Sequence, residues 1–133
     1  MVNTKSAPSD QDILTSLVEG KESVLQIPVD ILDTENEFVI VAQLPGIAVD
    51  NIDISVSGEV GVVVIEGVRN PPLSYTNTLT QECSWGAVYR RLLLPEAVAS
   101  DNVNANLANG VLTLRLEKAN QEISSNNTYD DSF

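Results

Sequence analysis

The sequence predicts an all-β domain built as a sandwich or a barrel. Between Leu25 and Lys118 the chain consists of short segments rich in Val, Ile and Leu that are separated by turn residues. Apolar and polar residues alternate in several of these segments, which is the period of two expected of a half-buried strand. We predict no helix in this part of the chain.

Residues 1–25 are predicted to form an arm in front of the domain. Ser9 and Asp12 resemble a capping box that would start a short helix, and Gly20 would end it. The apolar face of this helix consists of Ile13, Leu14, Leu17 and Val18. A helix this short is marginal in water, so this face needs a covering surface in its own domain, in another subunit or on a bound protein. A frayed terminus is the alternative.

Three strands are expected in the first half of the domain. The first runs from Glu37 to Leu44 and meets Pro45-Gly46, a pair suited to a type II turn because Gly accepts a positive φ. The second has an apolar face that is either buried or binds something. The residues of that face are Ile52, Ile54 and Val56. The third, from Gly61 to Ile65, is nearly all apolar, which predicts a strand covered on both faces near the middle of a sheet.

The second half of the domain begins with a long connection, residues 68–82. Its later part is β-prone and is expected to add an edge strand to its own sheet or to a neighbour's. A strand from Trp85 to Leu94 follows and is closed by Pro95. Asn109-Gly110 lies between two alternating segments and is the strongest short-range signal for a β-hairpin.

These patterns divide the chain into an arm (1–25), a β domain (26–118) and a tail (119–133). The tail is rich in Asn, Ser and Asp and holds few apolar residues. Such a segment cannot bury enough surface to offset the entropy of ordering it. We therefore expect the tail to be disordered.

The composition excludes several classes of function. Seven Lys and Arg against nineteen Asp and Glu give a formal net charge of −12, so neither nucleic acid nor an anionic membrane is an expected partner. The absence of His removes the commonest general base and the commonest ligand of catalytic zinc. We predict that the protein is not an enzyme and has no metal site.

The cysteine count and the terminus indicate the cellular compartment. The single Cys83 cannot form an intrachain disulfide, and the polar stretch from Met1 to Asp12 lacks the apolar core of a secretory signal. No apolar run approaches the roughly 20 residues of a membrane span. We predict a cytoplasmic protein.

Five motifs in the β domain stand in the order and at the spacing known from one protein family. The segment from Ala105 to Leu112 matches the pattern A-x-x-x-N-G-V-L of the small heat-shock proteins, the α-crystallin-type chaperones. The other four are Pro28-Val29-Asp30-Ile31, Leu44-Pro45-Gly46, Ile65-Glu66-Gly67-Val68-Arg69, and Trp85-Gly86 followed by Arg90 and Leu94-Pro95. Residues 26–118 therefore resemble this family, and their pattern is closer to its bacterial and plant members than to its animal ones.

The resemblance implies an immunoglobulin-like β-sandwich of seven or eight strands, the α-crystallin domain. It also implies an ATP-independent holdase that binds partly unfolded client proteins and keeps them from aggregating. In agreement, the chain has no Gly-rich phosphate loop, since Gly20-Lys21 lacks both the earlier Gly and the following Ser or Thr. No cofactor is expected.

The resemblance further implies a dimer in which residues 71–82 pair with the partner's sheet. The expected interface residues are Leu73, Tyr75, Leu79 and Arg90. Arg90 aligns with the family's arginine on the strand before Leu-Pro, but Arg91 stands beside it, which leaves open the question of which of the two points inward.

Family members also have an apolar groove between two edge strands, which receives an I-x-I or I-x-V motif from a neighbour's tail. Here the groove residues would be Ile52, Ile54, Val56, Val103 and Ala105. The tail offers only Glu122-Ile123-Ser124, so Ile123 would fill one pocket and the second anchor is missing. Ordinary core packing is the alternative reading of the same apolar residues.

Two rival functions are open besides the holdase. One is a co-chaperone or adaptor of the same fold that docks on a specific protein partner. The other is an enzyme with paired carboxylates, such as Asp30 with Asp33 or Asp50 with Asp53. These acids stand at strand ends and turns, where solvated acids are ordinary, which argues against the enzyme.

Overall fold

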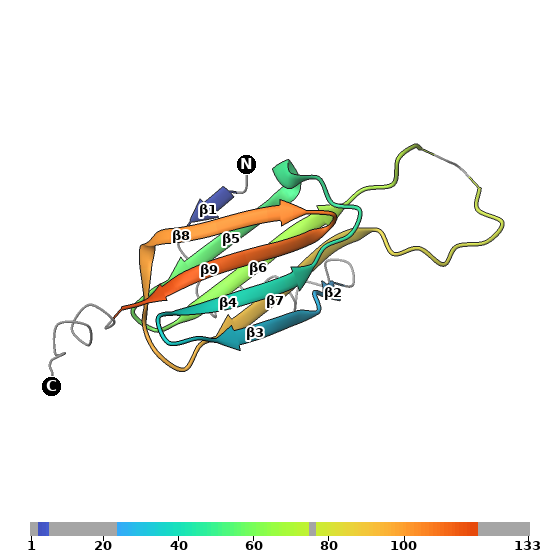
Figure 1. Ribbon diagram of the computed structural model, residues 1–133. Coiled ribbons are helices and arrows are strands. Elements are labelled where there is room, and N and C mark those ends of the chain that lie inside the picture. Colours follow the sequence, from blue (N-terminus) through green and yellow to red (C-terminus); the bar gives the residue numbers. More distant parts are fainter. Residues whose placement is uncertain (1–2, 6–23, 75–76, 120–133) are drawn as a thin grey trace, which may run out of the picture.

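Two β-sheets packed face to face make up the computed structural model, which describes residues 3–5, 24–74 and 77–119 (Figure 1). The five-stranded sheet has the order β1 (Asn3–Lys5), β5 (Ile52–Ser57), β6 (Val62–Arg69), β7 (Gly86–Leu93), β2 (Leu25–Gln26). The four-stranded sheet has the order β3 (Val29–Asp33), β4 (Glu37–Gln43), β9 (Val111–Lys118), β8 (Val98–Ala108). One 3-10 turn, η1 (Val49–Asn51), precedes β5. The predicted all-β sandwich is confirmed.

The hairpin predicted at Asn109-Gly110 joins β8 and β9. Both turn residues have positive φ, 55° and 77°, as a two-residue hairpin turn of type I′ requires. Leu112, Leu114 and Leu116 alternate along β9 and are completely buried, while the residues between them face outward. The period of two in the sequence therefore predicted correctly which residues of β9 are buried and which face outward.

Strand β6 occupies the middle of the five-stranded sheet, between β5 and β7. Every residue from Val62 to Ile65 is buried, which confirms the prediction of a strand covered on both faces. Val63 and Ile65 belong to the core between the sheets, whereas Val62 and Val64 are buried outside that cluster.

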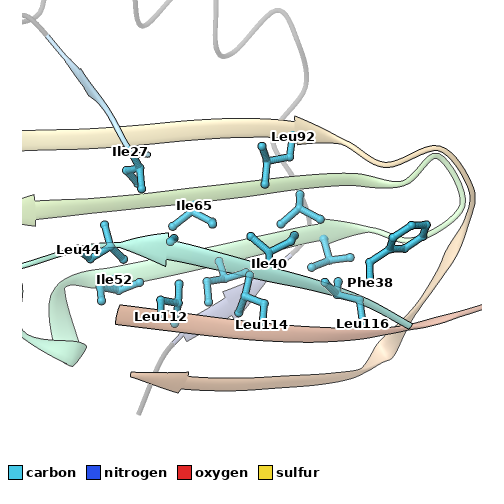
Figure 2. Close-up of a cluster of buried hydrophobic side chains, with 14 of the residues drawn as sticks. Ile27, Phe38, Ile40, Leu44, Ile52, Ile65, Leu92, Leu112, Leu114 and Leu116 are labelled. Atoms are coloured by element: carbon cyan, nitrogen blue, oxygen red, sulfur yellow. The ribbon is translucent and has the colours of Figure 1, made fainter. Parts of the chain in front are cut away.

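The core lies between the two sheets and consists of aliphatic side chains and one aromatic ring (Figure 2). Ile40 and Leu114 point into it from the four-stranded sheet, and Ile65 and Leu92 from the five-stranded sheet. Phe38 closes one end. Burial of this apolar surface is the main stabilising contribution in a fold without disulfides.

Gly58 allows the two sheets to approach each other at one corner. A Cβ at this position would lie 2.4 Å from the carbonyl oxygen of Val98, closer than a side chain tolerates. The backbone amide of Val98 also donates a hydrogen bond to the carbonyl of Gly58, at 2.9 Å. The end of β5 is thereby fixed against the start of β8.

Several predicted residues lie outside the described residues. These are Ile13, Leu14, Leu17 and Val18 of the arm, Tyr75 of the connection and Ile123 of the tail. Within the described part of the chain, no helix is long and apolar enough to cross a membrane.

Candidate functional site

The described residues hold no cluster suited to metal chemistry, since no group of three or more His, Cys, Asp or Glu side chains comes together there. Cys83 is an exposed free thiol. A hollow of about 410 Å³ lies in the connection between β6 and β7 and is lined by Asn77, Thr78, Leu79, Thr80, Gln81, Glu82, Cys83 and Trp85. Its lining holds a single carboxylate, Glu82, and no Lys or Arg. The features that suggest function are therefore apolar surfaces and a sheet edge.

The connection between β6 and β7 extends far beyond the sandwich (Figure 1). Leu79 is fully exposed and Leu73 is largely exposed, although both are large aliphatic side chains. In the described part of this connection no residue belongs to a strand, so the expected extra strand is not formed there with the chain's own sheet. Pairing with a neighbour's sheet stays a prediction.

Strand β3 forms an edge of the four-stranded sheet, and only β4 pairs with it among the described strands. The side chains of Ile31 and Leu32 are 41% and 49% exposed. The amide of Gln43 donates to the carbonyl of Pro28 at 3.1 Å, and the amide of Thr34 donates to the carbonyl of Glu37 at 3.0 Å. Because antiparallel pairing alternates, the peptide groups of the odd-numbered residues Val29, Ile31 and Asp33 face the open edge.

Of the two neighbouring arginines, Arg90 points inward and Arg91 does not. Arg90 lies on the same face of β7 as Val88 and Leu92, both buried, and its Nη1 donates to the carbonyl of Ile27 at 2.9 Å. Arg91 lies on the opposite face and is exposed. The Arg90 bond connects β7 to the segment that leads into β3, so it supports the open edge from within.

The predicted groove residues separate into two groups. Ile52 and Ile54 are completely buried and Val56 nearly so, and all three belong to the core cluster. Val103 and Ala105 are half-buried and pack against that cluster from β8. In the single chain, therefore, only the β8 side of the groove offers accessible apolar surface.

The edge of β5 is covered by a strand of the same chain. β1 pairs with it in parallel, with Asn3 opposite Asp53 and Lys5 opposite Ser55. Sequence reasoning missed this contact, because a pairing of three residues carries no periodic signal. The orientation of Arg90, in contrast, could have been predicted from its period-two spacing to Val88 and Leu92.

Lys118 forms an ion pair with Asp33, the last residue of β3. Its Nζ lies 2.7 Å from a carboxylate oxygen of Asp33, 3.8 Å from one of Glu96 and 4.8 Å from the centre of the Phe38 ring. The hydrogen bond to Asp33 raises the pKa of Lys118 above its ordinary value, against the opposing effect of desolvation.

Comparison with known proteins gives consistent matches. A family model described as the Hsp20/alpha crystallin family matches residues 30–128. Spore protein SP21 of Stigmatella aurantiaca is 34% identical over 89 residues, 67% of this chain and 53% of that protein, so the chain spans about half of its length. Heat shock protein HSP.16.4 of Streptococcus thermophilus is 36% identical over 118 residues, which cover 85% of this chain and 80% of that protein.

A solved structure shares both the fold and sequence identity. The hspA from Xanthomonas axonopodis superimposes with a TM-score of 0.63 and 31% sequence identity, over 73% of this chain and 97% of that one.

Proposed function

The chain belongs to the Hsp20/alpha crystallin family of small heat-shock proteins, a family of stress-response chaperones, and from this premise we propose that it is an ATP-independent holdase. It binds partly unfolded client proteins in the cytoplasm and keeps them from aggregating. The working domain is the sandwich of residues 26–118, with residues 1–25 as arm and 119–133 as tail. The family match over most of the chain is the observation that carries this proposal.

The building block we propose is a dimer in which the β6–β7 connection of each chain pairs with β3 of its partner. Two observations support it. Among the described strands β3 has only β4 as a neighbour and carries two half-exposed aliphatic side chains, and Leu73 and Leu79 of the connection are exposed. An unpaired edge strand is a template for strand addition, and exposed leucines gain about 1.5–3 kcal/mol each when they are fully buried.

Client binding in this proposal uses apolar surface of the arm and of the β8 side of the groove. Val103 and Ala105 supply the groove surface, and Ile13, Leu14, Leu17 and Val18 supply the arm surface. The tail residue Ile123 competes for the same groove and joins dimers into a higher oligomer only weakly, because it is a single anchor. The net charge of −12 keeps a particle loaded with apolar clients dispersed.

Light scattering from a heat-destabilised client protein tests the proposal. Near-equimolar protein without nucleotide is expected to suppress the scattering, and added ATP is expected to change nothing. A matched pair of variants tests the groove surface. Val103→Asp places a charge on it and should weaken suppression, whereas Asn104→Asp on the opposite face of β8 should not.

Unchanged scattering with the unmodified protein would contradict the holdase. Stoichiometric binding to one specific protein, without any effect on generic clients, would instead indicate an adaptor of the same fold.

A further inference from the structure

The outer edge of β5 is occupied by a very short strand of the same chain. β1 has three residues, Asn3–Lys5, and pairs in parallel with the stretch from Asp53 to Ser55, which is half of β5. Parallel pairing is slightly less stable per residue than antiparallel pairing, and none of the three residues of β1 is apolar. The pairing itself is therefore weak, and the covalent connection keeps β1 near the edge at a high effective concentration.

The surface beside this edge suits an apolar strand better than it suits β1. β8 is an edge strand of the other sheet and carries Val103, Ala105 and Leu107, which are half-buried against the core. The end of β5 and the start of β8 meet at one corner, where the amide of Val98 donates to the carbonyl of Gly58 at 2.9 Å. Both strands extend from this corner along the same side of the sandwich (Figure 1).

We propose that β1 is an autoinhibitory strand, which an extended apolar segment of a client protein displaces from the edge of β5. Such a segment can pair with all of β5, Ile52–Ser57, and place every second side chain against the half-buried residues of β8. The three polar residues of β1 offer no apolar side chain for that surface. This inference rests on the proposed holdase and specifies the form in which the protein takes a client.

Competition between β1 and the client sets the expected effects. The apparent affinity for the client is reduced to the fraction of chains in which the edge is open. A change that releases β1 therefore strengthens client binding, and a covalent bond that holds β1 in place weakens it.

Peptide binding to the full-length chain tests the release of β1. The probe is an acetylated heptapeptide of alternating valine and threonine, with a fluorophore on an added lysine, and fluorescence anisotropy reports its binding. Asn3→Pro combined with Thr4→Pro disrupts β1, because adjacent amides point to opposite sides of a strand and one of the two faces β5. We expect the dissociation constant to fall about tenfold.

The matched control is Asn3→Ala combined with Thr4→Ala, which keeps both amides and should give a much smaller change. Equal affinities of the proline and alanine variants would overturn the proposal.

Two further substitutions in the proline variant identify the edge that binds the peptide. Val103→Asp places a charge on the β8 side of the β5 edge and should abolish the gain in affinity. Ile31→Pro, at the open edge of β3, should preserve it. The reverse result would place the peptide on β3 and would overturn the proposal.

A disulfide tests the same step in a chain that keeps β1 in place. In the Cys83→Ser chain, Asn3→Cys and Asp53→Cys put two thiols at opposite positions of paired strands, about 4.8 Å apart, which a disulfide can bridge. The oxidised chain should bind the peptide about tenfold more weakly than the same chain after reduction. Equal binding in the two states, or thiols that do not form the disulfide, would contradict the proposal.

The peptide measurements distinguish failure of this inference from failure of the holdase. A chain that responds to both release and closure but does not suppress client scattering would refute the holdase and support the role of β1. A chain that suppresses scattering equally well in the oxidised and reduced states would support the holdase and refute autoinhibition by β1.

Discussion

The strands β5 and β3 differ in whether another strand of the same chain pairs with their outer edge. β5 is covered by β1 of the same chain, which pairs with it from Asn3 to Lys5. Among the described strands only β4 pairs with β3, and Ile31 and Leu32, on opposite faces of β3, are about half exposed. Both strands have apolar side chains and both could accept a further strand, so side-chain chemistry alone does not distinguish them.

The difference shows where this molecule can associate with a copy of itself. β1 occupies three positions along β5, from Asp53 to Ser55, whereas β3 presents an open row of peptide groups among the described strands. We therefore propose that strand addition occurs at β3 rather than at β5. The predictions below test the importance of the open edge, from the largest expected effect to the smallest.

Removal of one outward peptide donor on β3 should have the largest effect. The amide of Ile31 faces the open edge, so Ile31→Pro spares the hydrogen bonds to β4 and leaves a partner carbonyl without a donor. An unsatisfied group costs about 1–3 kcal/mol, and we expect the dimer dissociation constant to rise about 100-fold. Ile31→Ala, which keeps the donor, is the control.

Light scattering along a dilution series measures this dissociation constant. The open-edge account is wrong if the proline and alanine variants dissociate at the same concentration.

Loss of the leucine at the end of the connection should weaken the dimer less. Leu79→Ser removes apolar surface that is fully exposed in the single chain, so it should not change the free energy of unfolding of the monomer. We expect about a tenfold rise in the dissociation constant, equivalent to about 1.4 kcal/mol. Thr80→Ser at the next position should change nothing, and an equal effect of both variants would exclude Leu79 from the interface.

Loss of the Arg90 side chain should weaken the contact between β7 and the segment that precedes β3. Arg90→Ala removes the hydrogen bond from Nη1 to the carbonyl of Ile27 and should lower the free energy of unfolding by about 1 kcal/mol. Arg90→Lys keeps a charged donor and should recover part of the loss. Urea unfolding measures both values, and no change in either variant would show that this bond does not hold the segment before β3.

The smallest effect concerns the far end of β3 and depends on pH. Because the pKa of Lys118 is raised in the folded state, its stabilising contribution is complete below the ordinary pKa of 10.5 and is lost as the pH rises through the folded-state value. Lys118→Met should flatten the decrease of the thermal midpoint that the wild-type protein shows as the pH rises above the ordinary lysine pKa. A curve that stays parallel to that of the wild-type protein would contradict the assignment.

Most of the fold could be predicted because local patterns determine it. Asn109-Gly110 requires a hairpin, and the apolar run from Val62 to Ile65 requires a central strand. The covered edge of β5 could not be predicted, since it depends on three residues that meet a distant strand. For the site, the sequence named Arg90 but left its orientation open. Burial placed Ile52 and Ile54 in the core, because a period of two is the same in a groove as in a core.

Hydrogen exchange as a function of protein concentration tests the contrast between the two edges most directly. The account predicts that the amide of Ile31 is protected at high concentration and exchanges rapidly after dilution. Amides of β5 should exchange slowly at both concentrations, because the cover belongs to the same chain. Protection of β5 that disappears on dilution, or rapid exchange at Ile31 at every concentration, would contradict it.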